Sequence, residues 1–353
     1  MINNLYQGAW MTDIDDTLVL SGEMPDQSRL DAISKFTKVL KKHEILWIPM
    51  SGVAMVKLGP RILFRLPEDD FSHIYYYGGD GSLKYYFDEE SKEWKEDNNF
   101  SRLFSDAQSL IVLGEMEFRE SLVQLSSISG SDSSAIENQI SSAKELLIKK
   151  GYDLSDCILD ILKVKLDAAG IDPKLSETYF RGGSVSWMML GDVSADPYHE
   201  ESNLKLRFEL IELSRKWLKD HNDLSDIGTA GISVPFPGAR GIKFVLKGND
   251  KERSARDLMR WTGLNSKELL YAGNELFDGG NDNMLRKIES VTLLSVGDKE
   301  DPGHSIVNGR IGKDGNNMEG VHANLYWMDW VAGKLEKGEM WVDILEEMRS
   351  VNG

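Results

Sequence analysis

The sequence has a single cysteine, fewer basic than acidic residues, and no long apolar run. Each of these features excludes a class of protein or partner. Cys157 is the only cysteine in 353 residues, so no internal disulfide can form and a disulfide-rich secreted scaffold is excluded. No run of about 18 apolar residues occurs, and the segment Met1–Gln7 lacks the basic and apolar parts of a secretion signal. These absences predict a soluble, cytoplasmic protein in a reducing compartment.

The charge balance narrows the range of partners. The chain carries 41 basic and 58 acidic residues, which gives a net charge of −17. This surplus repels nucleic acids and anionic membranes, so we expect neither as a partner. The six histidines are scattered, without metal-ligand spacing. A small molecule is therefore the expected partner, and the sequence does not indicate an oligomeric state.

Hydrophobic patterning predicts a parallel α/β sheet at the start of the chain. Apolar runs at Ala9–Thr12 and Ile45–Met50 flank a helical pattern over Gln27–His43, as in a strand–helix–strand unit. A third strand at His73–Tyr77 leads through a glycine-rich turn into a hairpin that continues at Ser82–Phe87. The predicted fold class is α/β, with a Rossmann-like parallel sheet as the core.

The hydrophobic pattern changes in the middle of the chain, and the alternation of strands and helices returns after it. In the middle, helical patterns occur near 106–124, 135–150, 156–169 and 200–220. Strand patterns occur at Thr178–Leu190, Ile227–Phe236 and Arg240–Lys247. The later pattern predicts helices near 251–262, from Asn281 and over Val321–Leu335, and strands at Leu269–Ala272 and Val291–Val296. Because 353 residues exceed what one compact core usually reaches, we predict a core domain formed by residues 1–90 and 246–353, with an inserted α+β domain at 91–245.

Three carboxylates follow the first predicted strand. Asp13, Asp15 and Asp16 lie within four residues, at the carboxyl edge of the sheet, where open α/β folds bind ligands. Their mutual repulsion is costly unless a cation neutralises it, and an oxygen-rich site of this kind suits Mg²⁺. An acidic surface turn without a metal is the alternative interpretation.

Further candidates follow other predicted strands or open a helix. Ser51 and Gly52 come after the second strand, where a backbone amide can approach an anion, although a serine there is more often a helix cap. Lys251 could bring an ammonium group beside a phosphate, although a lone lysine at such a position is usually just solvated. The loop Gly273–Asp282 suggests the second half of a metal site, with a capped glycine-rich turn as the alternative.

Taken together and in this order, the four motifs resemble the haloacid dehalogenase superfamily. That family carries a DxDxT aspartate pair, a serine or threonine after the second strand, a lysine, and an acidic loop. The resemblance implies that Asp13 is a nucleophile and that Asp15 is a general acid and base. It also implies Mg²⁺ as the cofactor, with phosphate contacts from Ser51, Gly52 and Lys251 and metal ligands among Asp13, Asp15, Asn274, Asp278 and Asp282.

The insertion between the serine and the lysine resembles a type C2 cap, which characterises subfamily IIB. The segments Arg181–Gly191, Gly231–Val234 and Gly248–Lys251 are similar to the phosphomannomutase-like and sugar-phosphate phosphatase branch. Two residues depart from the family pattern. Asn274 replaces the usual aspartate of the acidic loop, which lowers the expected magnesium affinity, and Asp192 replaces an arginine that suits a second phosphate in mutases.

The resemblance implies Mg²⁺-dependent hydrolysis of a small phosphate monoester, a sugar or sugar-derivative phosphate, through an aspartyl-phosphate. The alternatives are a phosphosugar mutase and a catalytically weak binding protein, which the neutral Asn274 brings into consideration. Substrate choice is expected in the cap. Arg181, Trp187 and Lys243 are candidates there, although such residues on strands more often serve packing or the surface. The sequence does not indicate which phosphate compound is used.

Overall fold

The computed structural model describes ten segments of the chain, 5–20, 23–101, 177–181, 184–188, 236–238, 241–245, 250–277, 280–297, 306–312 and 317–350. The chain divides into two compact units, one made of Met1–Asn98 and Asp250–Gly353 and the other of Asn99–Asn249. The helices predicted near 106–124, 135–150, 156–169 and 200–220 lie outside the described residues.

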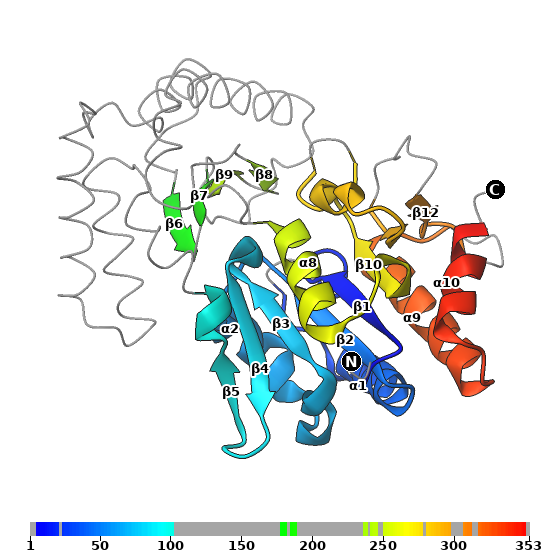
Figure 1. Ribbon diagram of the computed structural model, residues 1–353. Helices are drawn as coiled ribbons and strands as arrows, with labels where there is room; N and C mark the ends of the chain where they lie inside the picture. Colours follow the sequence, from blue (N-terminus) through cyan, green and yellow to red (C-terminus); the bar gives the residue numbers. More distant parts are fainter. Residues whose placement is uncertain are drawn as a thin grey trace, which may run out of the picture. The chain divides into compact units, whose positions relative to one another are not determined.

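The first unit is built on an eight-stranded sheet with the strand order β12-β11-β10-β1-β2-β3-β4-β5 (Figure 1). Its strands are β1 Gly8–Asp13, β2 Ile45–Met50, β3 Tyr75–Gly78, β4 Leu83–Asp88, β5 Glu93–Glu96, β10 Leu269–Gly273, β11 Thr292–Ser295 and β12 Ile306–Asn308. The strands from β12 to β3 are parallel, and β4 and β5 add an antiparallel edge. The predicted α/β class with a mostly parallel sheet is therefore confirmed, and β1 lies between β2 and β10 near its centre.

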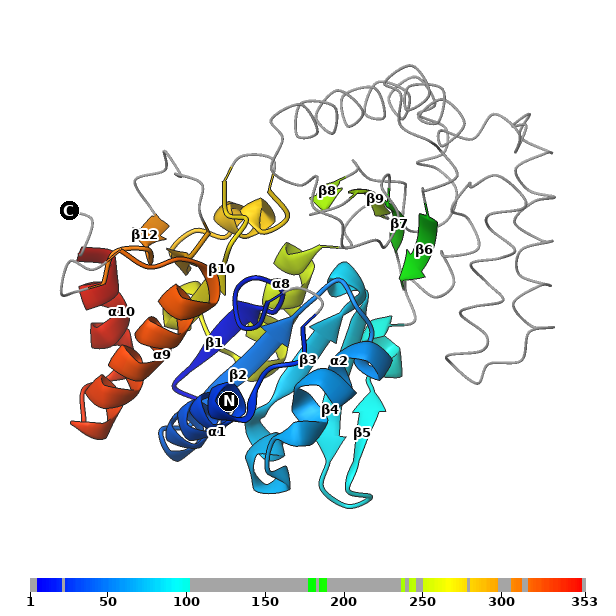
Figure 2. The same ribbon diagram turned by 180° about the vertical axis from the view of Figure 1, so that it is seen from behind.

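Helices cover both faces of this sheet. The described α-helices of the unit are α1 Gln27–Lys42, α2 Met55–Arg61, α8 Lys251–Thr262, α9 Gly320–Glu336 and α10 Trp341–Ser350. The two opposite views show α1 and α9 on one face and α8 on the other (Figures 1 and 2). All residues of β1 and β2 are buried, as expected for central parallel strands. Within the described part of the chain, no helix combines the length and apolar character that crossing a membrane requires.

Aspartate caps fix where two of these helices begin. The Asp26 carboxylate accepts a hydrogen bond of 2.8 Å from the Arg29 backbone N–H, so α1 starts at the next residue. Asp250 caps α8 in the same way, through a 2.9 Å bond from the Arg253 N–H. Lys251 is consequently the first residue of α8.

A tight turn between β3 and β4 packs against the start of α8. Gly79, Asp80 and Gly81 all adopt positive φ angles, of 57°, 56° and 99°. A Cβ atom at Gly81 would lie 2.3 Å from the Asp250 carbonyl oxygen, so a side chain cannot be accommodated there. The Arg253 Nη1 donates to the Gly81 carbonyl at 2.6 Å, which joins the hairpin to α8.

The prediction of a helix from Asn281 was wrong. The chain forms a short 3₁₀ turn at Asn283–Lys287 and then enters β11. Backbone bonds from Asp282 N–H to Glu275 O and from Gly280 N–H to Phe277 O fold the preceding loop back on itself. These contacts hold the residues around Asn281 in a loop, and only the short 3₁₀ turn follows before β11.

The second unit contains a four-stranded antiparallel sheet with the order β6-β7-β9-β8. Its strands are β6 Glu177–Arg181, β7 Ser184–Met188, β8 Phe236–Gly238 and β9 Gly241–Val245. The strand patterns predicted over Thr178–Leu190 and Arg240–Lys247 are confirmed as the β6–β7 hairpin and β9. The pattern predicted over Ile227–Phe236 meets the described residues only at Phe236.

His73 is a buried titratable group of the first unit. It ends the 3₁₀ turn Glu68–His73 and is 5% exposed. Burial lowers the pKa of the His73 imidazole to about 4, and a backbone contact with Thr37 opposes that shift only in part. The folded state thus favours the neutral ring, whereas the unfolded chain protonates at the usual value.

We predict that His73 makes the fold acid-sensitive between about pH 6.5 and about pH 4. The unfolded state binds the extra proton in this window, so the free energy of unfolding should fall by up to about 3 kcal/mol as the pH drops. Urea unfolding at several pH values should show this slope in the parent chain and lose it in His73→Leu. The exposed His322→Leu is the matched control, and equal slopes in His73→Leu and the parent would contradict the assignment.

Candidate active site

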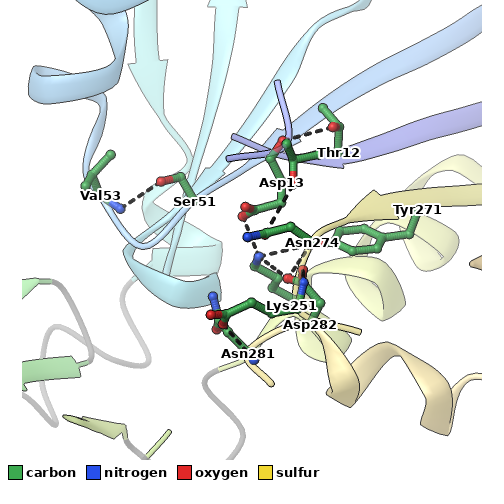
Figure 3. A network of polar contacts seen from close by, with 11 residues as sticks. Thr12, Asp13, Ser51, Val53, Lys251, Tyr271, Asn274, Asn281 and Asp282 are labelled. Atoms are coloured by element: carbon green, nitrogen blue, oxygen red, sulfur yellow. Dashed lines mark hydrogen bonds and ion pairs between the residues drawn. The ribbon is translucent and has the colours of Figure 1, made fainter. Parts of the chain in front are cut away.

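Polar side chains converge where β1, β2 and β10 end (Figure 3). Asp13 is the last residue of β1, Ser51 directly follows β2, and Asn274 directly follows β10. Because these strands are parallel neighbours, their carboxyl ends lie side by side at one edge of the sheet. The first residue of α8, Lys251, reaches the same place.

Lys251 is the centre of the network. Its Nζ lies 2.6 Å from Asp13 Oδ1, 2.5 Å from Asp282 Oδ1 and 2.9 Å from the Tyr271 hydroxyl. The side chain is 3% exposed, so these contacts replace water. An ammonium group has three donors, and each has an acceptor here.

Asp282 holds the loop that follows β10. Its Oδ1 accepts from Lys251 and, at 2.6 Å, from the Tyr271 hydroxyl, while its Oδ2 accepts at 3.0 Å from the Glu275 N–H. The Glu275 carboxylate in turn accepts from the Asn281 N–H at 3.2 Å. The carboxylate of Asp282 therefore ties α8, β10 and the loop together.

Two buried carboxyl groups share the single ammonium group of Lys251. Burial raises the pKa of the Asp13 carboxyl to about 8, the Lys251 ammonium opposes this rise, and Asp282 adds to it. Burial alone would lower the pKa of Lys251, but the carboxylates of Asp13 and Asp282 outweigh burial and raise it well above the usual value. Lys251 is consequently charged, and a second cation beside Asp13 would relieve the remaining repulsion.

Asp15 and Ser51 follow the strands β1 and β2 and have hydrogen-bond partners of their own. Asp15 Oδ1 accepts a bond of 2.6 Å from Arg61 Nη1, at the end of α2. Ser51 is buried, its Oγ accepts from the Val53 N–H at 3.3 Å, and Gly52 beside it is half-buried. The turns after β1 and β2 begin side by side at the same edge of the sheet, because the two strands are parallel neighbours.

The oxygens near Asp13 fit a magnesium ion, although sparsely. Asn274 lies beside Asp13 (Figure 3), and its Oδ1 accepts from the Thr17 hydroxyl at 3.3 Å. Mg²⁺ commonly uses one or two carboxylates and fills its other positions with water and phosphate oxygens. In the part of the chain that the structure describes, no group of three or more His, Cys, Asp or Glu side chains is arranged to hold a metal. The fit therefore depends on one carboxylate and one neutral amide oxygen.

The structure brings most of the predicted site residues to this edge, namely Asp13, Asp15, Ser51, Gly52, Lys251, Asn274 and Asp282. Asp278 lies outside the described residues. Arg181, Trp187 and Lys243 belong to β6, β7 and β9 of the second unit. The strand register places Arg181 and Lys243 on one face of that sheet and Trp187 on the other, so the three do not share a face.

Sequence reasoning missed three residues of this network. Tyr271 lies in β10, where its hydroxyl is the one polar side-chain tip in a buried strand, and that contrast was a usable signal. Thr17 is the threonine of the DxDxT motif, and its contact with Asn274 was not predicted. Arg61 lies at the end of a helix that the sequence pattern did not predict, and nothing local to it indicated a contact with Asp15.

Comparison with solved structures shows the fold. An IMP-bound IMP-nucleotidase variant from Plasmodium falciparum matches with a TM-score of 0.51 and 12% identity, over 82% of this chain and 63% of that chain. An IMP-bound, N-terminally truncated form matches with a TM-score of 0.50 and 12% identity, over 81% and 63% of the two chains. The chain thus spans less than two thirds of the length of these nucleotidases. The likeness shows the fold alone, a mixed α/β fold with a mostly parallel, Rossmann-like sheet.

Two other structures match less well. Sucrose-phosphatase from Synechocystis, in complex with sucrose and phosphate, gives a TM-score of 0.41 with 14% identity, over 82% of this chain and 83% of that one. A haloacid dehalogenase-like hydrolase from Bacillus subtilis gives 0.43 with 11% identity, over 95% and 93%. No protein-family model and no curated protein sequence matches the chain.

We predict that Lys251→Met lowers the free energy of unfolding by about 3–5 kcal/mol, because it leaves two buried carboxylates without their cation. Urea unfolding in EDTA measures this loss without any metal contribution. Lys35→Met is the matched control, since Lys35 pairs with Asp329 at 3.3 Å on the exposed surface and should contribute less than about 1 kcal/mol. Equal losses in the two variants would show that the buried pair does not stabilise the fold.

Proposed function

We propose that the chain is a magnesium-dependent phosphatase that hydrolyses a small phosphate monoester, with sugar or sugar-derivative phosphates as the substrate class. The observation that most supports this is the buried Lys251 ammonium, 2.6 Å from Asp13 at the carboxyl edge of the sheet. Phosphoryl transfer depends mainly on positioning and on neutralising charge. A carboxylate held beside a fixed cation supplies both.

In the proposed first step, the Asp13 carboxylate oxygen that does not hold Lys251 attacks phosphorus. The bond between phosphorus and the ester oxygen breaks, and Asp15 gives its proton to the departing alkoxide. Lys251, the Ser51 hydroxyl and the Gly52 backbone amide bind phosphoryl oxygens. The product of this step is an alcohol and an aspartyl-phosphate on Asp13.

In the second step, water attacks the aspartyl-phosphate. Asp15, now a carboxylate, takes a proton from the water as the new phosphorus–oxygen bond forms. The bond between phosphorus and the Asp13 oxygen breaks, which returns Asp13 to a carboxylate and releases inorganic phosphate. Asp15 ends protonated, ready for the next turnover.

Asp13 and Asn274 are the residues that we propose to hold Mg²⁺. When bound, the ion neutralises charge on the phosphate and on Asp13. Asp15, Asp278 and Asp282 remain further candidate ligands from the sequence. The three hydrogen bonds that Asp282 accepts favour a role for it as the anchor of Lys251 instead.

We further propose that residues 91–245 form a cap inserted into a core made of 1–90 and 246–353. The division of the chain at Asn98 and Asp250 supports this, as does the separate antiparallel sheet of the second unit. Arg181 and Lys243, which share a face of that sheet, are the favoured substrate contacts, and Trp187 is the weaker candidate.

The first test is phosphate release from a panel of sugar, polyol, glycerate and nucleoside monophosphates, with Mg²⁺ and with EDTA. Nucleoside phosphates are included because the nucleotidases of like fold are named for one. We expect release only with metal, and a loss of at least about 10³-fold in Asp13→Asn, which removes the nucleophile. Asp329→Asn makes the same chemical change on the exposed surface and should not alter the rate.

Other outcomes of the panel would point to the rival functions. Turnover only with a bisphosphorylated activator, with the phosphate transferred to a second hydroxyl, would identify a mutase. Ligand binding without turnover in excess Mg²⁺ would identify a binding protein, the function that the neutral Asn274 favours as second candidate. Full activity of Asp13→Asn would sink the proposed mechanism.

We predict that Asn274→Asp strengthens Mg²⁺ binding by about tenfold, because it adds a negative ligand next to Asp13. Calorimetric titration of the parent chain and the variant with MgCl₂ alone measures the dissociation constant without a substrate. Asn308→Asp, at the end of β12, adds the same charge outside the site and is the control. An unchanged constant in Asn274→Asp would show that residue 274 is not a ligand.

A further inference from the structure

We infer that Arg61 is a positioning residue, which holds the Asp15 carboxylate in the orientation needed to exchange protons during the reaction. The inference rests on the proposed function, since it assigns Asp15 the role of general acid and base. It concerns a residue outside all four sequence motifs. The contacts of its guanidinium group carry the argument.

Arg61 binds the segment that follows β1 at three residues. Its Nη1 donates to Asp15 Oδ1 at 2.6 Å, its Nη2 to the Leu20 carbonyl at 2.5 Å, and its Nε to the Glu23 carbonyl at 2.8 Å. All three nitrogens of the group are therefore engaged. The side chain is 16% exposed, which limits competition by water.

Asp15 needs an external support, because its own loop leaves the side chain partly in solvent. The Asp15 side chain is 36% exposed. The backbone around it is fixed by a left-handed Asp16, with φ 59°, and by the bond from Asp16 N–H to Val19 O at 2.8 Å. A fixed backbone still leaves several rotamers to an exposed aspartate. The rigid fork of Arg61 selects one of them.

The position of Arg61 in the fold connects this support to the site. It is the last residue of α2, and α2 starts four residues after Ser51. The arginine thus links the turn after β2 to the turn after β1, the two segments proposed to face the phosphate. A displacement of about 1 Å in a reacting group can cost about 100-fold in rate, so a fixed Asp15 has a direct kinetic value.

Arg65 provides a matched control within the same structure. Its Nη1 donates to the Pro25 carbonyl at 3.0 Å, so it fastens the same segment one turn further on. The structure gives it no contact with Asp15. A purely structural role predicts similar effects for Arg61→Gln and Arg65→Gln, whereas a positioning role predicts a kinetic change in Arg61→Gln alone.

The test uses 4-nitrophenyl phosphate, whose leaving group departs without a proton. Formation of the aspartyl-phosphate on Asp13 then does not need Asp15, whereas attack by water does. In Arg61→Gln we expect the initial burst of nitrophenolate to slow by less than about threefold and the steady-state rate to fall by about 10–100-fold. With sugar phosphates, both steps need proton transfer by Asp15, so Arg61→Gln should also lose the initial burst of released sugar. Arg65→Gln should match the parent in both phases.

Arg61→Lys keeps the positive charge and one contact. It should also slow the steady-state rate more than the burst, but by a smaller factor than Arg61→Gln does. It also serves if Arg61→Gln does not fold, as judged by circular dichroism and urea unfolding. Equal losses in burst and steady state, or equal behaviour of the Arg61 and Arg65 variants, would overturn the inference while the parent remains active. A parent chain without phosphatase activity would remove the proposed function, and the inference with it.

Discussion

The site depends on one buried interaction, the contact of Lys251 with the carboxylates of Asp13 and Asp282. The partners are 238 and 31 residues from the lysine in sequence. None of the three could be buried alone, because an unpaired charge in the interior costs several kcal/mol. The end of β1, the start of α8 and the loop after β10 are therefore stabilised only together. The three charged groups of the site therefore depend on one another for their burial.

Charge compensation also distinguishes the acids of the site that have their own partners from Asp13, which shares its partner. Asp282 is satisfied by three donors, and Asp15 is paired with Arg61. Asp13 shares Lys251 with Asp282 through one carboxyl oxygen, which leaves its other oxygen for another partner. A phosphate would add repulsion there unless a second cation came with it. A cation beside Asp13 would meet the neutral amide of Asn274, which attracts it less than an aspartate would.

Much of the first unit could be predicted because its signals are local. The apolar runs of β1 and β2 and the caps Asp26 and Asp250 act within a few residues, and they fix most boundaries to within one or two positions. Elements whose stability comes from tertiary contacts were missed or misjudged. The loop after β10 is held by Asp282, so no helix forms at Asn281, and α10 escaped notice although its buried residues recur at helical spacing.

The same distinction separates the site residues that could be found from those that could not. Asp13, Ser51 and Asn274 follow strands, and parallel topology brings strand ends together whatever the loops do. Arg61 reaches Asp15 across 46 positions, along a path set by the packing of α2 and by the bonds to the segment after Val19. Motifs therefore identify the groups that we propose to contact the phosphate, whereas the orientation of those groups depends on residues that carry no motif. Two chains with the same four motifs can differ in rate for this reason.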